Sequence, residues 1–358
     1  MILGYNSVKT VGTAGIVSSL PGATSYSTFC NSDSFWCQAH TAANTVNWSK
    51  LDAIVAAAKA GGCTSGLYVL YGCPTFLAQA ADQSVAGPNG LLGENSYPTD
   101  LSQLAWFCQQ FAARNQAVWG GFFRWVQLFN EPETGGTPFT STASFFKYSA
   151  AQFVAQMWTA HTALKAADPT LETLSAGTFK STVMTTWLDT QEAVSGQGKY
   201  GYQCFDHVAL HPYYARPNPT YGWRGDFATL NAGGLNTFKA IMAARGRPGL
   251  KYYATEWGFS TYDPPVSTLI LAMTPAERAT LMTRTIMGAL RAGFSGLWPW
   301  GVGHANNYAG QLGFDSSGLD AGYNAAAAAL SGRTKTSAGY YPDGRESMTF
   351  SDGTTYVV

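Results

Sequence analysis

Residues 125–132 have the sequence WVQLFNEP, in which the apolar run Trp125–Phe129 leads directly into Asn130-Glu131-Pro132. Its length and its aromatic and branched residues are typical of a β-strand. A second run of this kind, Tyr252–Thr255, leads into Glu256-Trp257-Gly258. Each stretch therefore predicts a buried strand that ends at a glutamate.

The same order of short strand, loop and helix extends outward along the chain. Residues Gly66–Tyr71 form an unbroken apolar run, as expected for a parallel strand that is buried on both faces. The other predicted strands are Ile2–Asn6, Ser25–Phe29, Thr170–Ala176, His207–Leu210 and Gly296–Trp300. Together these patterns predict about eight strands.

Helix signals lie between the predicted strands. Thr274, Pro275 and Glu277 form a capping-box pattern at a helix start, and Gly293 is placed to end that helix. Alternating strands and helices predict parallel βα units. No Gly-x-Gly-x-x-Gly follows any strand, so we expect a closed (β/α)8 barrel rather than an open dinucleotide-binding sheet.

We assign residues 1–335 to this α/β barrel and residues 336–358 to a C-terminal β-hairpin packed on it. The reason is that Glu346–Val358 holds a Ser-Asp-Gly turn between β-prone runs.

The composition excludes several classes of partner. The 358 residues carry 21 Lys+Arg and 21 Asp+Glu, so we expect neither nucleic acid nor an anionic membrane as a partner. No run of 18 apolar residues could span a bilayer. The 11 Trp and 19 Tyr suit a neutral carbohydrate, whose C–H faces stack on aromatic rings.

The cysteines and the N-terminus bear on metals and on location. None of the six Cys makes a Cys-x-x-Cys pair and only five His are present, so we expect no metal site. Cys30 and Cys37 flank a polar loop and could form a disulfide or remain free thiols. The N-terminus shows no basic and hydrophobic leader, so we expect a mature extracellular form or release by another route.

Two carboxylates at strand ends suit one particular chemistry. Glu131 and Glu256 are 125 residues apart, which is about three βα units, so both should lie at the same rim of one ring. Cleavage of a glycosidic bond needs two such groups: one protonates the leaving oxygen, and the other attacks the anomeric carbon or activates water.

The chain resembles glycoside hydrolases of clan A, whose retaining members of the family 39 and family 5 types carry such motifs. The resemblance rests on Asn130-Glu131-Pro132 after the fourth predicted strand and Thr255-Glu256-Trp257-Gly258 after the seventh. Further matching stretches are Asn47–Asp52, Tyr71–Phe76, Asp206–Tyr213 and Trp298–Trp300. Members often carry an arginine on the second strand, whereas residues 25–36 contain no Arg or Lys.

The resemblance implies a role for each matching residue. Glu131 would be the acid/base, Glu256 the nucleophile, and Asn130 the partner of the sugar 2-hydroxyl. His211 and Tyr213 would border the nucleophile, and Trp298 would form the floor of the subsite. Sugar contact and structural packing are both open for the remaining aromatic candidates, which are Trp36, Tyr71, Trp257 and Trp300.

The expected function is a retaining, endo-acting glycosidase that is monomeric and needs no cofactor. The alternative from another class is a barrel that binds glycans without cleaving them, which would not need both glutamates. A metal-dependent barrel hydrolase would have His-x-His at the end of the first strand, where this chain has Tyr5-Asn6-Ser7.

Overall fold

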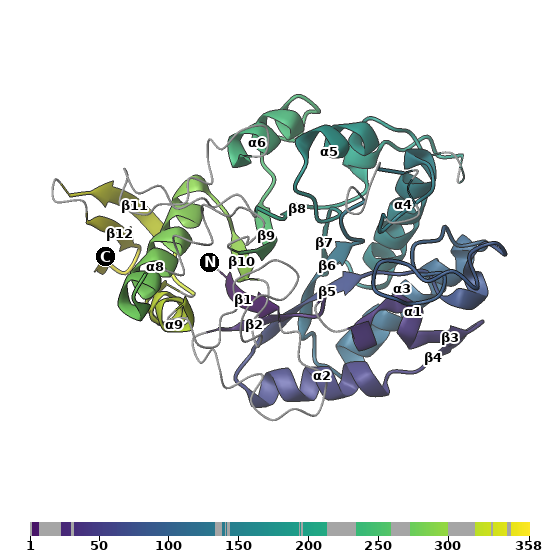
Figure 1. Ribbon diagram of the computed structural model, residues 1–358, viewed down its shortest axis with the longest axis horizontal. Helices are drawn as coiled ribbons and strands as arrows, with labels where there is room; N and C mark the ends of the chain where they lie inside the picture. Colours follow the sequence, from purple (N-terminus) through teal and green to yellow (C-terminus); the bar gives the residue numbers. More distant parts are fainter. Residues whose placement is uncertain are drawn as a thin grey trace.

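A computed structural model of the chain describes residues 2–6, 23–29, 32–132, 138, 139, 141, 144–192, 194, 196–212, 234–258, 273–299, 319–330, 332–341 and 345–358. Eight parallel strands lie at its centre, with helices around them (Figure 1). In chain order the strands are β1 (Ile2–Asn6), β2 (Ser25–Ser27), β5 (Ser65–Leu70), β6 (Phe123–Leu128), β7 (Glu172–Leu174), β8 (Val208–Leu210), β9 (Tyr252–Trp257) and β10 (Gly296–Pro299).

These strands form a closed ring in the order of the sequence. β1 pairs with β2 on one side and with β10 on the other, and the remaining neighbours follow in turn. The last gap, between β7 and β8, is closed by a parallel bridge from Leu174 to His207, with the Ser175 N–H donating to the His207 carbonyl at 2.9 Å. The predicted (β/α)8 barrel is therefore confirmed. β2 confirms the placement of the second strand, which carries no arginine.

The main helices lie outside this ring (Figure 1). They are α2 (Ser49–Ala60), α3 (Leu101–Ala117), α4 (Ala150–Ala167), α5 (Ser181–Leu188), α6 (Leu235–Ala243), α8 (Pro275–Ala292) and α9 (Leu319–Leu330). The smaller elements are η1 (Ser32–Ser34), α1 (Trp36–Ala39), the paired strands β3 (His40–Ala42) and β4 (Thr45–Val46), η2 (Thr75–Leu77) and η3 (Gly201–Gln203). The capping box of α8 is present as predicted: Thr274 Oγ1 accepts from the Glu277 N–H, and Gly293 ends the helix at φ 108°. Among the described helices, none combines the length and the apolar character needed to cross a membrane.

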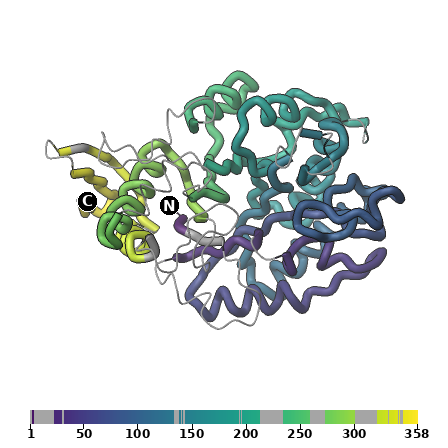
Figure 2. The backbone as a smooth tube through the Cα atoms, viewed as in Figure 1, coloured from purple at the N-terminus to yellow at the C-terminus, as the bar shows by residue number. Residues whose placement is uncertain are grey.

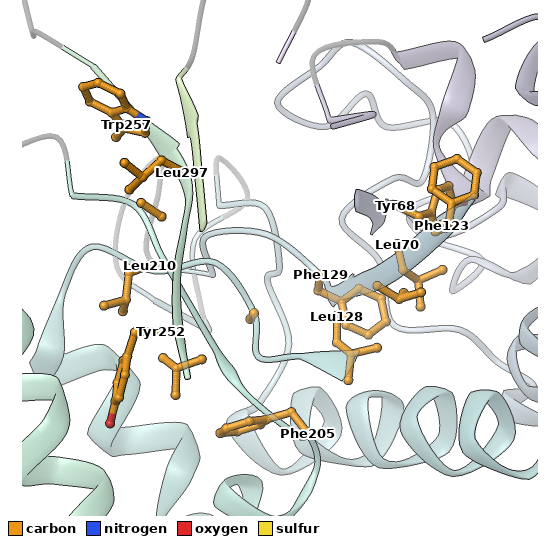
Figure 3. Close-up of a cluster of buried hydrophobic side chains, with 14 of the residues drawn as sticks. Tyr68, Leu70, Phe123, Leu128, Phe129, Phe205, Leu210, Tyr252, Trp257 and Leu297 are labelled. Carbon is orange, nitrogen blue, oxygen red and sulfur yellow. The ribbon is translucent and has the colours of Figure 1, made fainter. Parts of the chain in front are cut away.

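The strands separate two layers of buried side chains. Inside the ring, Leu67, Trp125, Tyr253 and Trp298 belong to one cluster. A larger cluster fills the space between the strands and the helices, and Figure 3 shows part of it, with Leu128 of β6 as one member. Strand residues alternate between these layers, so any break in the alternation changes which side chain faces the barrel interior.

A small antiparallel sheet follows the barrel and lies at one end of the molecule, beside α8 and α9 (Figure 2). Its strands are β11 (Lys335–Tyr340), β12 (Glu346–Phe350) and β13 (Thr355–Val357). β12 and β13 form the predicted hairpin, and β11 adds a third strand that the sequence pattern did not indicate. Met348 of β12 is buried in the outer core, and Arg291 Nη2 of α8 donates to the buried Glu346 at 2.6 Å.

Cys37 carries a free thiol, which favours the second of the two alternatives for this residue. Cys30 lies outside the described residues. Burial raises the pKa of the Cys37 thiol, so this sulfur is held in its unreactive, protonated form.

Candidate active site

Three strand ends bring two glutamates and a histidine together. Glu131 follows β6, the fourth strand of the ring, Glu256 lies on β9, the seventh, and His211 follows β8. One carboxylate oxygen of each glutamate and one ring nitrogen of the histidine all lie within 4.8 Å of one another. All three side chains are buried, with the glutamates 8% and 4% exposed.

His211 bridges the two carboxylates. Its Nδ1 lies 2.5 Å from Glu131 Oε1, and its Nε2 lies 3.6 Å from Glu256 Oε1. Its own backbone N–H donates to the carbonyl of Thr178 at 2.8 Å, which fixes where the strand end lies. Two ligands of one tetrahedral zinc ion would be roughly 3.3 Å apart. The 2.5 Å separation between His211 Nδ1 and Glu131 Oε1 is too short for two such ligands and is that of a short direct hydrogen bond.

A β-bulge allows Glu256 to face the barrel interior. Leu297 and Pro299, two residues apart on β10, pair with Ala254 and Trp257, three residues apart on β9. The extra residue on β9 breaks the alternation, so that Ala254 and Trp257 both pack in the outer core. Glu256 is thereby turned toward His211. Bulges near active sites commonly redirect a side chain in this way.

The backbone before the other glutamate is also irregular. Phe129 has φ 68° and Glu131 has φ 28°, values that residues other than glycine rarely adopt. The Glu131 N–H donates to the Gly177 carbonyl at 2.9 Å, and the Gly177 N–H donates to the Phe129 carbonyl at 3.4 Å. These bonds tie the end of β6 to the segment that follows β7. Such a conformation costs roughly 1–3 kcal/mol per residue and persists where surrounding structure enforces it, often at functional sites.

Gly177 and Gln127 belong to this assembly, although neither was predicted from the sequence. A Cβ atom on Gly177 would lie 2.2 Å from His211 Nε2 and 2.8 Å from Gln127 Nε2, so only glycine leaves room for these two side chains. Gln127 donates to the Asn130 side chain at 3.0 Å. A signal existed in the sequence: Gly177 directly follows a predicted strand, and Gln127 interrupts an otherwise apolar one.

Trp298, predicted as the floor of the subsite, lies in the barrel interior. It is fully buried, its Nε1 donates to Ser25 Oγ at 3.3 Å, and its ring lies 5.8 Å from that of Trp125 and 6.1 Å from that of Tyr253. The ring also lies against Gly296, toward the N-terminal side of the barrel. These contacts support a packing role for Trp298.

Two further aromatic candidates also pack in the core. Trp257 is fully buried beside Leu297 (Figure 3). Trp36 is fully buried in the outer core, where its Nε1 donates to His40 Nδ1 at 3.0 Å. The contacts of both tryptophans support the structural alternative over sugar stacking.

Tyr71 lines the same cavity as the site residue Asn130. Both line a cavity of about 10 Å³, together with Glu94, Ser96 and Phe145. A cavity of this volume is just large enough to admit one water molecule. Burial raises the pKa of Glu94, which also accepts hydrogen bonds from Asn89. Tyr213 and Trp300, the remaining predicted site residues, lie outside the described residues.

Comparison with known proteins supports the fold. No protein-family model matches the sequence, and a search of curated proteins finds no match. Solved structures do match. A family 39 glycoside hydrolase from Bacteroides cellulosilyticus WH2 has a TM-score of 0.61 at 15% identity, over 99% of this chain and 68% of that chain.

Two further solved structures give the same result. A glucosidase from Croceicoccus marinus has a TM-score of 0.61 at 14% identity, over 99% of this chain and 80% of its own. The catalytic domain of GH30 xylanase C from Talaromyces cellulolyticus has a TM-score of 0.59 at 16% identity, over 99% and 82%. The chain thus shares the barrel fold of these glycoside hydrolases.

Proposed function

We propose that this protein is a retaining glycosidase that cleaves a polysaccharide or oligosaccharide. The observation that carries the proposal is the pair of buried carboxylates Glu131 and Glu256, with oxygens within 4.8 Å of each other at one rim of the barrel. Retaining glycosidases hold their two carboxyl groups about 5–5.5 Å apart, whereas inverting enzymes need about 6.5–9.5 Å to admit a water molecule. The glycoside hydrolase fold of the structural neighbours supports the same reaction class.

The proposed reaction has two displacements. Glu256 attacks the anomeric carbon while Glu131 gives its proton to the leaving glycosidic oxygen, which forms a glycosyl ester on Glu256 and releases the first product. Glu131, now ionised, takes a proton from water, and the resulting nucleophile breaks the ester and frees Glu256. His211 contacts both carboxylates and would hold them in position relative to each other through both steps.

We also propose endo action on a largely neutral glycan outside the cell. The 12% content of charged residues and the 11 Trp and 19 Tyr of the chain suit contact with several uncharged sugar units. Polysaccharides do not cross membranes, so an enzyme that cleaves them would act outside the cell. Size analysis of early products from xylan, glucan and mannan tests this: long oligosaccharides are expected first, and release of single sugars alone would contradict endo action.

Activity on 2,4-dinitrophenyl β-D-xyloside, β-D-glucoside and β-D-mannoside tests the chemistry. Glu256→Ala should abolish turnover, and added azide should give the glycosyl azide of inverted configuration. Glu131→Ala should slow turnover by about a hundred- to ten-thousand-fold, and azide should give the retained azide. Glu172→Ala, at the opposite end of the barrel, serves as the matched control and should keep wild-type kcat.

Three outcomes would contradict the proposal. Full activity of Glu256→Ala would show that the nucleophile is another group. A first product of inverted configuration, seen by proton NMR, would exclude the retaining mechanism. A wild-type protein that binds these polysaccharides without releasing reducing ends would instead be a glycan-binding barrel.

A further inference from the structure

A buried glutamine lies on the same strand as the site. Gln127 of β6 is fully buried, and its side-chain Nε2 makes two hydrogen bonds. It donates to the Phe129 backbone carbonyl at 3.0 Å and to Asn130 Oδ1 at 3.0 Å. Both partners lie in the irregular segment that leads to Glu131.

These two bonds fix the orientation of both amides. A backbone carbonyl can only accept a hydrogen bond, so the Gln127 atom that faces Phe129 must be its NH2 group. The same NH2 group faces the Asn130 side chain, so the Asn130 atom on that side must be the accepting oxygen. The Asn130 Nδ2 is therefore turned away from Gln127. It is buried and has no hydrogen-bond partner in the described part of the chain.

We propose that Gln127 is a positioning residue that keeps the Asn130 amide turned so that it donates to the substrate. This inference rests on the proposed glycosidase function and on the expected contact of Asn130 with the sugar 2-hydroxyl. A donor that is buried and already oriented binds a hydroxyl without the cost of turning at the moment of reaction. Without Gln127, the amide of Asn130 can present either its oxygen or its nitrogen.

Gln127 is the group that sets the orientation of the Asn130 amide. The backbone of Asn130 is fixed by its bridge to Gly177, so the main remaining freedom is rotation of the side-chain amide. Gln127 is held in its turn by its two hydrogen bonds, to the Phe129 carbonyl and to Asn130 Oδ1.

The test compares substrates with and without the 2-hydroxyl. The kcat/KM values of wild type, Gln127→Met, Asn130→Ala and the double variant are measured on the aryl β-glycoside that wild type cleaves best and on its 2-deoxy analogue. Loss of one oriented hydrogen bond should reduce the preference for the 2-hydroxyl substrate at least about tenfold in Gln127→Met. The double variant should be no worse than Asn130→Ala.

Asn115→Ala is the matched control. Asn115 is also a fully buried amide bonded to the β6 backbone, but at the other end of the strand, where its Nδ2 donates to the Phe123 carbonyl at 2.9 Å. This variant should be less stable and should keep the wild-type substrate preference. If Gln127→Met does not fold, Gln127→Leu provides the same measurement.

An unchanged preference in Gln127→Met, with rates falling equally on both substrates, would overturn the inference and leave a purely structural role. Additive effects in the double variant would also overturn it, because two independent residues add. A wild-type protein that cleaves none of the glycosides would refute the proposed function, and this inference with it. An active wild-type protein whose substrate preference is unchanged by Gln127→Met would refute this inference alone.

Discussion

Gly177→Ala should greatly slow the proposed glycoside cleavage while the barrel still folds. The added methyl carbon would lie 2.2 Å from His211 Nε2 and 2.6 Å from its Cε1, whereas ordinary contacts begin at 3.4 Å. The imidazole must therefore move by about an ångström, away from positions 2.5 Å from Glu131 and 3.6 Å from Glu256. The Gln127 amide, 2.8 Å from the new methyl, would also be displaced.

The size of the effect follows from this displacement. A misplacement of about 1 Å in a catalytic assembly can cost about a hundredfold in rate, which corresponds to about 2.7 kcal/mol of activation free energy. Overpacking of a buried position should reduce the free energy of unfolding by about 1–3 kcal/mol. Activity should therefore fall much more than the folded fraction at 25 °C.

The assay is kcat/KM on the best aryl β-glycoside, alongside thermal unfolding followed by circular dichroism. Gly249→Ala is the control, because a Cβ atom there would have no neighbour within 4 Å. Wild-type kcat/KM in a folded Gly177→Ala protein would refute the reasoning, since it would mean that the position of His211 does not matter for turnover.

Three further predictions concern stability. The nearby His207 imidazole, whose Nε2 lies 3.7 Å from Glu172 Oε1, and the hydrogen bonds from Lys251 and Trp125 lower the pKa of Glu172 below its ordinary value of 4.5. Glu172 therefore stabilises the fold above that pH, and the stability is lost as pH falls through the lowered pKa. Glu172→Gln should therefore have a lower Tm than wild type at pH 7, and the difference should shrink below pH 4.5; an equal difference at every pH would contradict this. Arg291→Met should cost about 3 kcal/mol in urea unfolding, because it removes a charged hydrogen-bond donor from the fully buried Glu346 carboxylate. Thr274→Ala should cost about 1 kcal/mol through the lost N-cap of α8, and an unchanged Cm would contradict that role.

The sequence predicted the barrel well because its strands carry strong local signals. Runs such as Gly66–Tyr71 are apolar throughout, and the capping box at Thr274 marks a helix start without reference to the rest of the chain. The weakest signal, at Ser25, still proved to be a strand. The third strand of the C-terminal sheet, Lys335–Tyr340, was not predicted, because its residues are polar or small and gain their order from pairing with β12.

The aromatic residues were the hardest to place. Trp36, Trp257 and Trp298 have the chemistry of sugar-binding residues, but all three are fully buried. Alternation along a strand predicts the direction of a side chain only while the register is regular. The bulge on β9 reverses that direction at Trp257, and no local pattern marks where an extra residue is inserted.

Glu131 and Glu256 were identifiable from the sequence as strand-end acids, because a hydrophobic strand that stops at a carboxylate is a local pattern. The resemblance implied that His211 borders Glu256, but the sequence could not show that His211 also contacts Glu131, or that Gly177 and Gln127 pack at these strand ends. Those contacts join residues up to 80 positions apart. They depend on closure of the ring, on a bulge and on left-handed backbone conformations, which only the packing of the whole barrel can enforce.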